Sequence, residues 1–408
     1  MDSGENPFTP GFGQAPPVLA GRDDLLGLAA TALASGPRHV AFTSLLLGPR
    51  GVGKTALLAA IEEEARSAGW HVVKAAALFN PREGTGPVPH FEEQCWDILD
   101  GIDPPRRGRL TGIALPVAGG GAQWEHRPER EPSFQKLVQN TVDAVVREGS
   151  AGVLLTLDEF HNLSESEASE IATVLQHLTK LDQRPLAFFG VGLPHLEYTL
   201  LTHPGFTFFQ RCNRLRIDNI SLHDAMHAIE VPFAAHDTPV PLPELKRAAG
   251  ATRGYGYAIQ SIGYHLWDLC GSPTGAVTSA HVGEAVTRME EDVARNVTMP
   301  IWARLSDNDK RFLCAMTPDT GPSRLRDIAQ RLGRDGVHVS KYRRRLLDEG
   351  VVLDAGRGYL SFANGEVRYR AIAEHDLYQT HRDAAGGAPE EVPDEPHLRN
   401  GGTAPPLG

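Results

Sequence analysis

Between an apolar run and an alanine- and leucine-rich segment, the chain carries the sequence Gly48-Pro49-Arg50-Gly51-Val52-Gly53-Lys54-Thr55. This is the pattern G-x-x-x-x-G-K-[ST], the phosphate-binding P-loop. The apolar run predicts a strand and the segment after the motif predicts a helix, which is the setting that a P-loop requires. Glycines let successive backbone N–H groups face one concavity, and the helix adds its positive N-terminal end. We therefore expect these eight residues to bind ATP or ADP.

Within the motif, Lys54 is expected on the β- and γ-phosphates, and the Thr55 hydroxyl is expected to hold Mg²⁺. The alternative is a glycine-rich turn that matches by chance. The chain has only seven lysines in 408 residues, which argues against a chance G-K-[ST] in this setting.

A second signature is the pair Asp158-Glu159, which ends an apolar strand predicted at 152–157. Ligands gather at the carboxyl ends of parallel strands, so Asp158 is expected to face the Mg²⁺ held by Thr55. Glu159 is then expected to polarise the attacking water, as a catalytic residue beside Lys54. A carboxylate pair after a strand also serves as a helix cap, but the order of the two motifs favours nucleotide hydrolysis.

Strands alternate with helices through the first 220 residues, which predicts a three-layer α/β domain around a mainly parallel sheet. Beside the strand that precedes the P-loop, strands are predicted at 71–77, 152–157, 185–191 and 215–217, and helices at 134–147 and 167–178. The expected divisions are an extended arm at 1–20, the α/β domain at 21–220, a helical lid at 221–300, a winged helix-turn-helix domain at 301–380 and a disordered tail at 381–408. Within the α/β domain, a proline- and glycine-rich insertion is expected at 81–131, irregular apart from one short helix at 91–99.

Net charge, apolar runs and cysteine usage limit the classes of protein to which the chain can belong. The net charge of −11 argues against non-specific binding of nucleic acid by the chain as a whole. No apolar run approaches the ~20 residues that a membrane helix needs, and the first residues are acidic and polar, unlike a signal peptide. We expect a cytoplasmic protein without membrane contact. The four cysteines are expected to be buried thiols because they form no C-x-x-C pair.

Taken together, these segments resemble the AAA+-like ATPases related to archaeal and eukaryotic replication initiators and to the STAND signalling ATPases. The resemblance covers roughly residues 17–380. The segment 17–25, with Arg22, looks like the "v-G-R-e-x-e-L" stretch that the family places beside the adenine, so Arg22 is implied as a nucleotide contact. The segment 187–194 matches the family's fourth strand, but Gly190 and Gly192 stand where many members have a polar sensor-1 residue.

Two further segments fit the resemblance. The segment 209–214 stands where the family carries its arginine finger, which implies Arg211, or Arg214 as a second candidate, acting on a neighbouring subunit. An ordinary surface arginine is the alternative. The segment 252–260 resembles the lid stretch "G-x-P-y-x-l-Q", with Gly256 in place of the proline. Tyr257 falls where initiators place a sensor-2 arginine, and Arg253 is expected to substitute as a nucleotide contact.

The C-terminal part has the order helix, helix, helix and two strands. Helices are predicted from Ser306, at 323–332 and at 339–347, and the strands at 351–354 and 358–362 flank Arg357. This order predicts a winged helix-turn-helix. Residues 321–370 hold eleven lysines and arginines and six acidic residues, so they carry +5 while the remainder carries −16. A basic patch on an acidic protein is a nucleic-acid signal.

The predicted DNA-contacting residues are Ser340, Lys341 and Arg344, which share one helical face suited to the major groove. Arg357, at the tip of the wing, is expected on phosphate or in the minor groove. The chain is therefore predicted to be an ATP-hydrolysing switch that couples nucleotide state to duplex DNA. Two alternatives stay open. One is a STAND-like signalling or defence ATPase whose winged helix serves protein contacts or autoinhibition. The other is an oligomeric loader or regulator acting on a protein partner.

Overall fold

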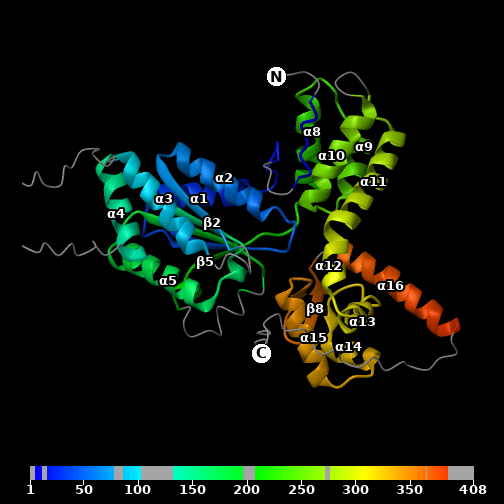
Figure 1. Cartoon of the computed structure of the whole chain (residues 1–408). Coiled ribbons are helices and arrows are strands. Elements are labelled where there is room, and N and C mark those ends of the chain that lie inside the picture. Colours follow the sequence, from blue (N-terminus) through cyan, green and yellow to red (C-terminus); the bar gives the residue numbers. More distant parts are fainter. Residues whose placement is uncertain are drawn as a thin grey trace, which may run out of the picture. The chain divides into compact units, whose positions relative to one another are not determined.

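The structure, a computed structural model, describes residues 5–11, 16–77, 86–102, 132–194, 196, 207–271, 276–363 and 365–384. The chain forms two compact units, unit 1 at 1–293 and unit 2 at 294–408 (Figure 1). Residues 294–300, which the sequence assigns to the lid, thus fall in unit 2. Each unit is described by itself below.

A five-stranded parallel sheet forms the centre of unit 1, with the strand order β2-β3-β4-β1-β5. The strands are β1 Thr43–Leu47, β2 Trp70–Ala76, β3 Gly152–Asp158, β4 Leu186–Gly192 and β5 Asn213–Arg216. Strands β1, β3 and β4 are almost wholly buried, because both faces of the sheet are covered. The predicted parallel sheet is confirmed.

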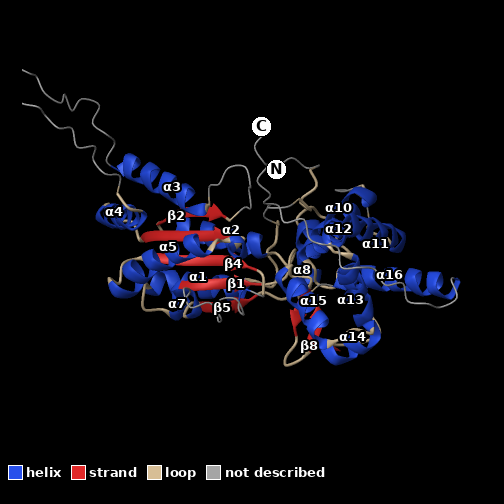
Figure 2. Cartoon of the chain, turned by 60° about the horizontal axis from the view of Figure 1, so that its bottom comes forward, coloured by secondary structure: helices blue, strands red, loops and turns tan. Residues whose placement is uncertain are grey.

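Helices cover both faces of this sheet (Figure 2). On one face lie α1 Asp23–Ser35 and α2 Lys54–Ser67, and on the other lie α3 Pro87–Ile102, α4 Phe134–Arg147 and α5 Glu165–Leu175. Shorter helical turns are η1 Val40–Phe42, η2 Phe160–Asn162, η3 Gln176–Leu181 and α7 Thr207–Gln210. These are the three layers expected from the alternating pattern.

Helix α3 corrects the sequence analysis, which allowed only a short helix at 91–99. Pro87 and Pro89 lie in its first turn, where their missing N–H groups cost no hydrogen bond. Phe91 is buried and stacks on Phe134 of α4, with ring centroids 6.2 Å apart. Tertiary packing therefore extends a helix against the signal of the prolines. The remainder of the predicted insertion that lies at 81–85 and 103–131 is outside the described residues.

Four helices form the lid part of unit 1: α8 Leu222–Ala234, α9 Leu242–Ala251, α10 Gly256–Cys270 and α11 Ser279–Val293. The first of these helices is capped, since the Ser221 hydroxyl accepts the Asp224 N–H.

The described part of the N-terminal arm docks on these lid helices. Phe8 is 2 % exposed, and its ring lies 5.6 Å from that of Phe233 in α8. The Asn6 amide donates to the Tyr264 carbonyl of α10 at 3.0 Å. A Cβ added at Gly263 would overlap the Phe8 ring, so only glycine leaves room for it.

Unit 2 combines helices with a three-stranded antiparallel sheet of order β6-β8-β7. Its elements are η5 Ala294–Thr298, α12 Met299–Arg304, α13 Asp307–Met316, β6 Ser323–Arg324, α14 Leu325–Leu332, α15 Gly336–Asp348, β7 Val352–Asp354, β8 Tyr359–Phe362 and α16 Gly365–Ala384. Ser306, where a helix was predicted to begin, forms a capping box with Asp309. Gly333, in a left-handed conformation, ends α14 as predicted.

Three features of unit 2 differ from the sequence analysis. Ser323 and Arg324 form a strand rather than the start of a helix, because their backbone pairs with β8. Helix α15 begins at Gly336, three residues early, because the Asp335 carboxylate caps it. Helix α16 was not predicted. It packs Val367 and Ala371 into the core of unit 2 and extends into the predicted tail as far as Ala384. The rest of that tail, 385–408, lies outside the described residues.

Candidate functional site

The P-loop joins the end of β1 to the start of α2. Gly51 and Gly53 have φ values of 74° and 95°, in the left-handed region that favours glycine. Gly48 is required by packing, since an added Cβ would lie 2.6 Å from the Ile217 carbonyl oxygen. Gly53 is also the N-cap of α2, so the loop delivers its backbone N–H groups to the positive end of a 14-residue helix. This local geometry fits a phosphate group.

The two sequence motifs meet at the carboxyl edge of the sheet. The Thr55 hydroxyl donates to Asp158 Oδ2 at 2.7 Å, although the two residues are 103 positions apart. The other carboxylate oxygen of Asp158 accepts the Glu159 N–H at 2.8 Å. A hydroxyl and a carboxylate side by side supply the hard oxygen ligands that Mg²⁺ prefers. The residues present therefore fit the metal that the P-loop implies.

The backbone of the P-loop holds the Lys54 side chain, since the Lys54 ammonium donates to the Pro49 carbonyl at 2.6 Å. Burial lowers the pKa of Lys54 to about 8, and the nearby Glu159 and Asp158 carboxylates oppose that shift. A phosphate placed in the loop would add negative charge and favour the ammonium further. The side chain is thus placed to respond to an anion.

Glu159 follows β3 in a strained conformation, with φ 54° and ψ 36°. Its carboxylate oxygen Oε2 lies 3.1 Å from Nε2 of His161, which is on the next turn of chain, η2. The side chain of His161 is 6 % exposed, whereas that of Glu159 is 35 % exposed. His161 was not among the site residues predicted from the sequence. Its only sequence signal is its place two residues after the carboxylate pair.

Arg22 lies beside the P-loop, but its guanidinium is directed to backbone carbonyls. It donates to Val52 of the loop at 3.1 Å and to Asp218 at 2.7 Å. Asp218 belongs to the segment 217–221 that joins β5 to α8, here called the hinge. Burial lowers the pKa of Arg22. In this structure the side chain connects the P-loop to the hinge, and the nucleotide contact implied by the resemblance stays a prediction.

The lid contacts the P-loop through the start of α10. Tyr255, the N-cap of that helix, lies against Gly51 so closely that an added Cβ there would overlap the phenol. A Cβ at Gly256 would lie 3.5 Å from the Gly51 carbonyl oxygen. Tyr255 was not among the site residues predicted from the sequence. Arg253, which was among them, has an exposed side chain, and its carbonyl accepts from the Asn219 amide of the hinge.

The two candidates for the predicted arginine finger stand just before and within β5. Arg211 is exposed in the turn that follows α7, and Arg214 of β5 donates to the Gln210 carbonyl at 3.0 Å. At the fourth strand, Gly190 is enforced by packing, since an added Cβ would lie 2.9 Å from Leu45 Cδ2. No polar side chain stands there, as the sequence indicated.

In unit 2, the residues predicted to contact DNA are exposed. Ser340, Lys341 and Arg344 lie along α15, and Arg357 lies between β7 and β8. Val337 precedes them on the same helical face and is 79 % exposed, a residue that the charge pattern could not reveal.

Two other arginines of α15 are engaged within the unit. Arg343 pairs with Asp354, and Arg345 pairs with the buried Asp309. The basic run 343–345 therefore leaves Arg344 as its outward member.

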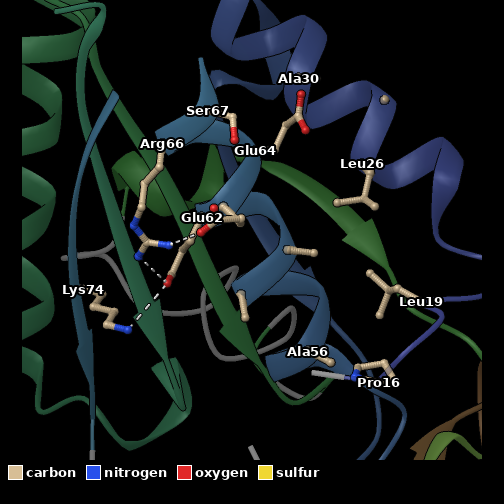
Figure 3. Close-up of a pocket in the computed structure, with 14 residues that line it drawn as sticks. Pro16, Leu19, Leu26, Ala30, Ala56, Glu62, Glu64, Arg66, Ser67 and Lys74 are labelled. Carbon is tan, nitrogen blue, oxygen red and sulfur yellow. Dashed lines mark hydrogen bonds and ion pairs between the residues drawn. The ribbon is translucent and has the colours of Figure 1, made fainter. Parts of the chain in front are cut away.

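A cavity of about 770 Å³ lies between α1 and α2, separate from the P-loop (Figure 3). Among the lining residues in the described ranges, none belongs to Gly48–Thr55. Its polar part is a network around Glu62, which accepts from the Thr156 hydroxyl at 2.6 Å and lies 3.4 Å from Arg66 and 3.9 Å from Lys74. This network joins α2 to β2 and β3.

All four cysteines are buried, reduced thiols, as predicted: Cys95, Cys212, Cys270 and Cys314. Burial raises the pKa of Cys95 to about 11 and that of Cys212 to about 12, so these two remain protonated and unreactive near neutral pH. Within the part of the chain that is described, no helix is long and apolar enough to cross a membrane.

Residues 18–189 match the family model described as an AAA ATPase domain. Residues 295–368 match a second model, described as a domain of unknown function (DUF8462). No curated protein matched the chain in sequence. The chain thus carries an AAA ATPase domain, whose P-loop chemistry uses ATP with Mg²⁺.

The solved structures that share the fold over most of the chain include the following two. The Walker-type ATPase paby2304 of Pyrococcus abyssi is 15 % identical with a TM-score of 0.62, and the match covers 86 % of this chain and 96 % of that protein. The ORC2 protein of Aeropyrum pernix, solved as ADPNP–ADP complexes, is 16 % identical with a TM-score of 0.57, covering 92 % and 98 %. At these identities the likeness shows the fold alone, whereas the AAA+-like class inferred from the motifs is supported by the family match at residues 18–189.

Proposed function

From its AAA ATPase domain and its basic C-terminal face, we propose that this ATPase is a nucleotide-driven switch that binds duplex DNA through unit 2. The observation that carries the ATPase half is the 2.7 Å contact between Thr55 and Asp158, which brings the two sequence motifs together. The observation that carries the DNA half is the exposed face of Val337, Ser340, Lys341 and Arg344 on α15.

In the proposed reaction, each residue of the site has one task. Lys54 and the backbone N–H groups of the P-loop bind the phosphates, and Thr55 and Asp158 offer oxygen ligands to Mg²⁺. Glu159 accepts a proton from the attacking water. Mg²⁺, when bound, neutralises charge on the phosphates. Arg211 is proposed to act on the site of a neighbouring copy, because its exposed side chain lies outward after α7.

The lid gives this site a route to the rest of the chain. Tyr255 and Gly256 touch the P-loop turn, and Arg22 ties that loop to the hinge. A phosphate that displaced the P-loop would therefore change its contacts with Tyr255 and Gly256. It would also change the link that Arg22 makes between the loop and the hinge. Helix α11 ends at Val293, where unit 2 begins in sequence. We propose that lid movement carries the nucleotide state to unit 2.

We assign unit 2 as a winged helix-turn-helix on the order of its elements. Helices α13, α14 and α15 are followed by the hairpin β7–β8, and β6 completes the sheet. In this assignment α15 is the recognition helix, with Lys341 and Arg344 at base edges or phosphates and Val337 available to a thymine methyl group. Arg357 occupies the wing. The buried, reduced thiols fit a reducing compartment, and we propose the cytoplasm.

The test is duplex binding by the full chain, measured by fluorescence anisotropy over a salt series with and without ATP. Replacing Lys341, Arg344 and Arg357 by alanine should reduce the salt slope by about one unit for each side chain that had neutralised a phosphate. Glu159→Gln, which is expected to bind ATP without turnover, holds the ATP-bound state during the measurement.

A matched control removes the same charge elsewhere. Arg38, Arg147 and Lys246 are exposed residues of unit 1, and their triple alanine variant also loses three positive charges. This control should bind DNA as the parent does. Equal binding by the parent and the unit 2 variant at every salt concentration would remove DNA from the proposal and favour a winged helix that contacts protein.

A further inference from the structure

We propose that His161 is a positioning residue for hydrolysis, holding the Glu159 carboxylate in the orientation from which it accepts the proton of water. This inference rests on the proposed role of Glu159. It begins from one contact, the 3.1 Å separation between His161 Nε2 and Glu159 Oε2.

The backbone around Glu159 brings the two side chains together. Glu159 adopts the left-handed conformation, and η2 then turns the chain back so that the Asn162 N–H donates to the Glu159 carbonyl at 2.9 Å. The Asn162 side-chain amide donates to the Ala77 carbonyl at 3.0 Å, just after β2. The turn is therefore closed on itself and anchored to the sheet. A strained residue at such a place is typical of a functional constraint.

The turn that carries the imidazole is also packed against its surroundings. Phe160, the residue between the pair, is buried, and its ring meets that of Phe209 edge-on at 4.8 Å. His161 itself is 6 % exposed. Glu159, at 35 % exposure, remains accessible to solvent and to a ligand. A largely buried imidazole thus lies beside a carboxylate that would otherwise choose among several rotamers.

Asp158 provides a comparison for the restraint on the Glu159 carboxylate. Its two carboxylate oxygens are held by the Thr55 hydroxyl and by the Glu159 N–H, so its orientation is set twice. For Glu159, the restraint of this kind that the structure shows is His161. A general base must lie within hydrogen-bond reach of the proton that it removes, and catalytic contacts that are imperfect without substrate often tighten when substrate binds.

The test uses two variants that distinguish the effect of the imidazole nitrogen from the effect of the aromatic ring. His161→Phe keeps an aromatic ring but removes the nitrogen, whereas His161→Gln places an amide nitrogen near the position of Nε2. In steady-state ATP hydrolysis, we expect His161→Phe to lower kcat about ten-fold with KM unchanged, since misplacing a catalytic group costs one to two orders of magnitude. His161→Gln should recover most of that loss. Thermal unfolding and direct ATP titration show whether each variant is folded and binds nucleotide.

The Glu159→Gln background separates this inference from the proposed function. If His161 acts through Glu159, then His161→Phe should cause no further loss of kcat in that background. Parental turnover by Glu159→Gln alone would instead refute the catalytic role of Glu159, whatever the histidine variants do. Where Glu159→Gln lowers kcat to a residual rate that can still be measured, three results would overturn the positioning role. These are unchanged or raised kcat in His161→Phe, equal loss in both histidine variants, and a full further loss in the double variant.

Discussion

At the scale of single residues, the titration of Lys54 predicts how ATP affinity depends on pH. Burial lowers its pKa from 10.5 to about 8 in the nucleotide-free protein. Because phosphates bind the ammonium form, we expect the contribution of Lys54 to ATP affinity to be constant below pH 8. Above pH 8 it should fall by up to about ten-fold per pH unit, as the free protein loses the proton that binding must restore. Calorimetry in buffers of different ionisation enthalpy would detect this proton uptake.

The control is Lys54→Ala, which should bind ATP weakly and without this slope above pH 8. An unchanged slope in Lys54→Ala would assign the proton to another group. The same shift has a consequence for the nucleotide-free fold. The folded pKa lies below the unfolded one, so the buried ammonium destabilises the fold fully below pH 8, and this cost disappears as the pH rises to 10.5.

At the scale of elements, the docking of the N-terminal arm on the lid depends on one aromatic ring and one glycine. Phe8→Ala should lower the free energy of unfolding by about 2–3 kcal/mol. This loss of stability is at or below the low end of the range for truncating a buried phenylalanine to alanine. The reason is that a terminal segment can detach instead of leaving a cavity. Hydrogen exchange should rise at the Thr9 N–H, which donates to Gln260 Oε1 at 3.3 Å.

Gly263→Ala provides the matching variant from the lid side. In the parent it should destabilise, because the new Cβ overlaps the Phe8 ring. In the Phe8→Ala background the overlap is gone, and alanine in α10 should stabilise by up to about 1 kcal/mol as the better helix former. The sign of the effect should therefore reverse. Chemical denaturation of the four proteins measures it, and the same sign in both backgrounds would mean that the arm does not occupy this slot in solution.

At the scale of the whole molecule, the exposed Arg211 predicts that hydrolysis depends on association. Subunits with Arg211→Ala can bind ATP but lack the finger, and subunits with Lys54→Ala supply Arg211 but bind ATP weakly. Mixing the two inactive proteins should restore part of the turnover, since an arginine supplied in trans contributes roughly 10³–10⁵ in rate where it operates. Turnover per subunit that is independent of both concentration and mixing would show that Arg211 is an ordinary surface residue.

Much of unit 1 followed from local patterns. The P-loop and the pair Asp158-Glu159 each stand between elements whose apolar periodicity is strong, so their order along the chain predicted a parallel sheet with both motifs at one edge. The 2.7 Å contact between Thr55 and Asp158 agrees with that prediction. The order of elements in the C-terminal part was also largely visible, because Gly333 and Gly350 end its helices.

Other features were decided only by the tertiary structure. Helix α3 forms despite two prolines because its buried face packs against α4, and Ser323 becomes a strand because β8 is beside it. Arg22 turns to backbone carbonyls that lie 30 and 196 residues away in sequence. His161 and Tyr255 become part of the site through a left-handed turn and a lid contact that no periodicity encodes. The physical reason is common to all of them. Sequence patterns report local conformation and average burial, whereas the partners of a side chain are set by which distant segments the fold brings against it.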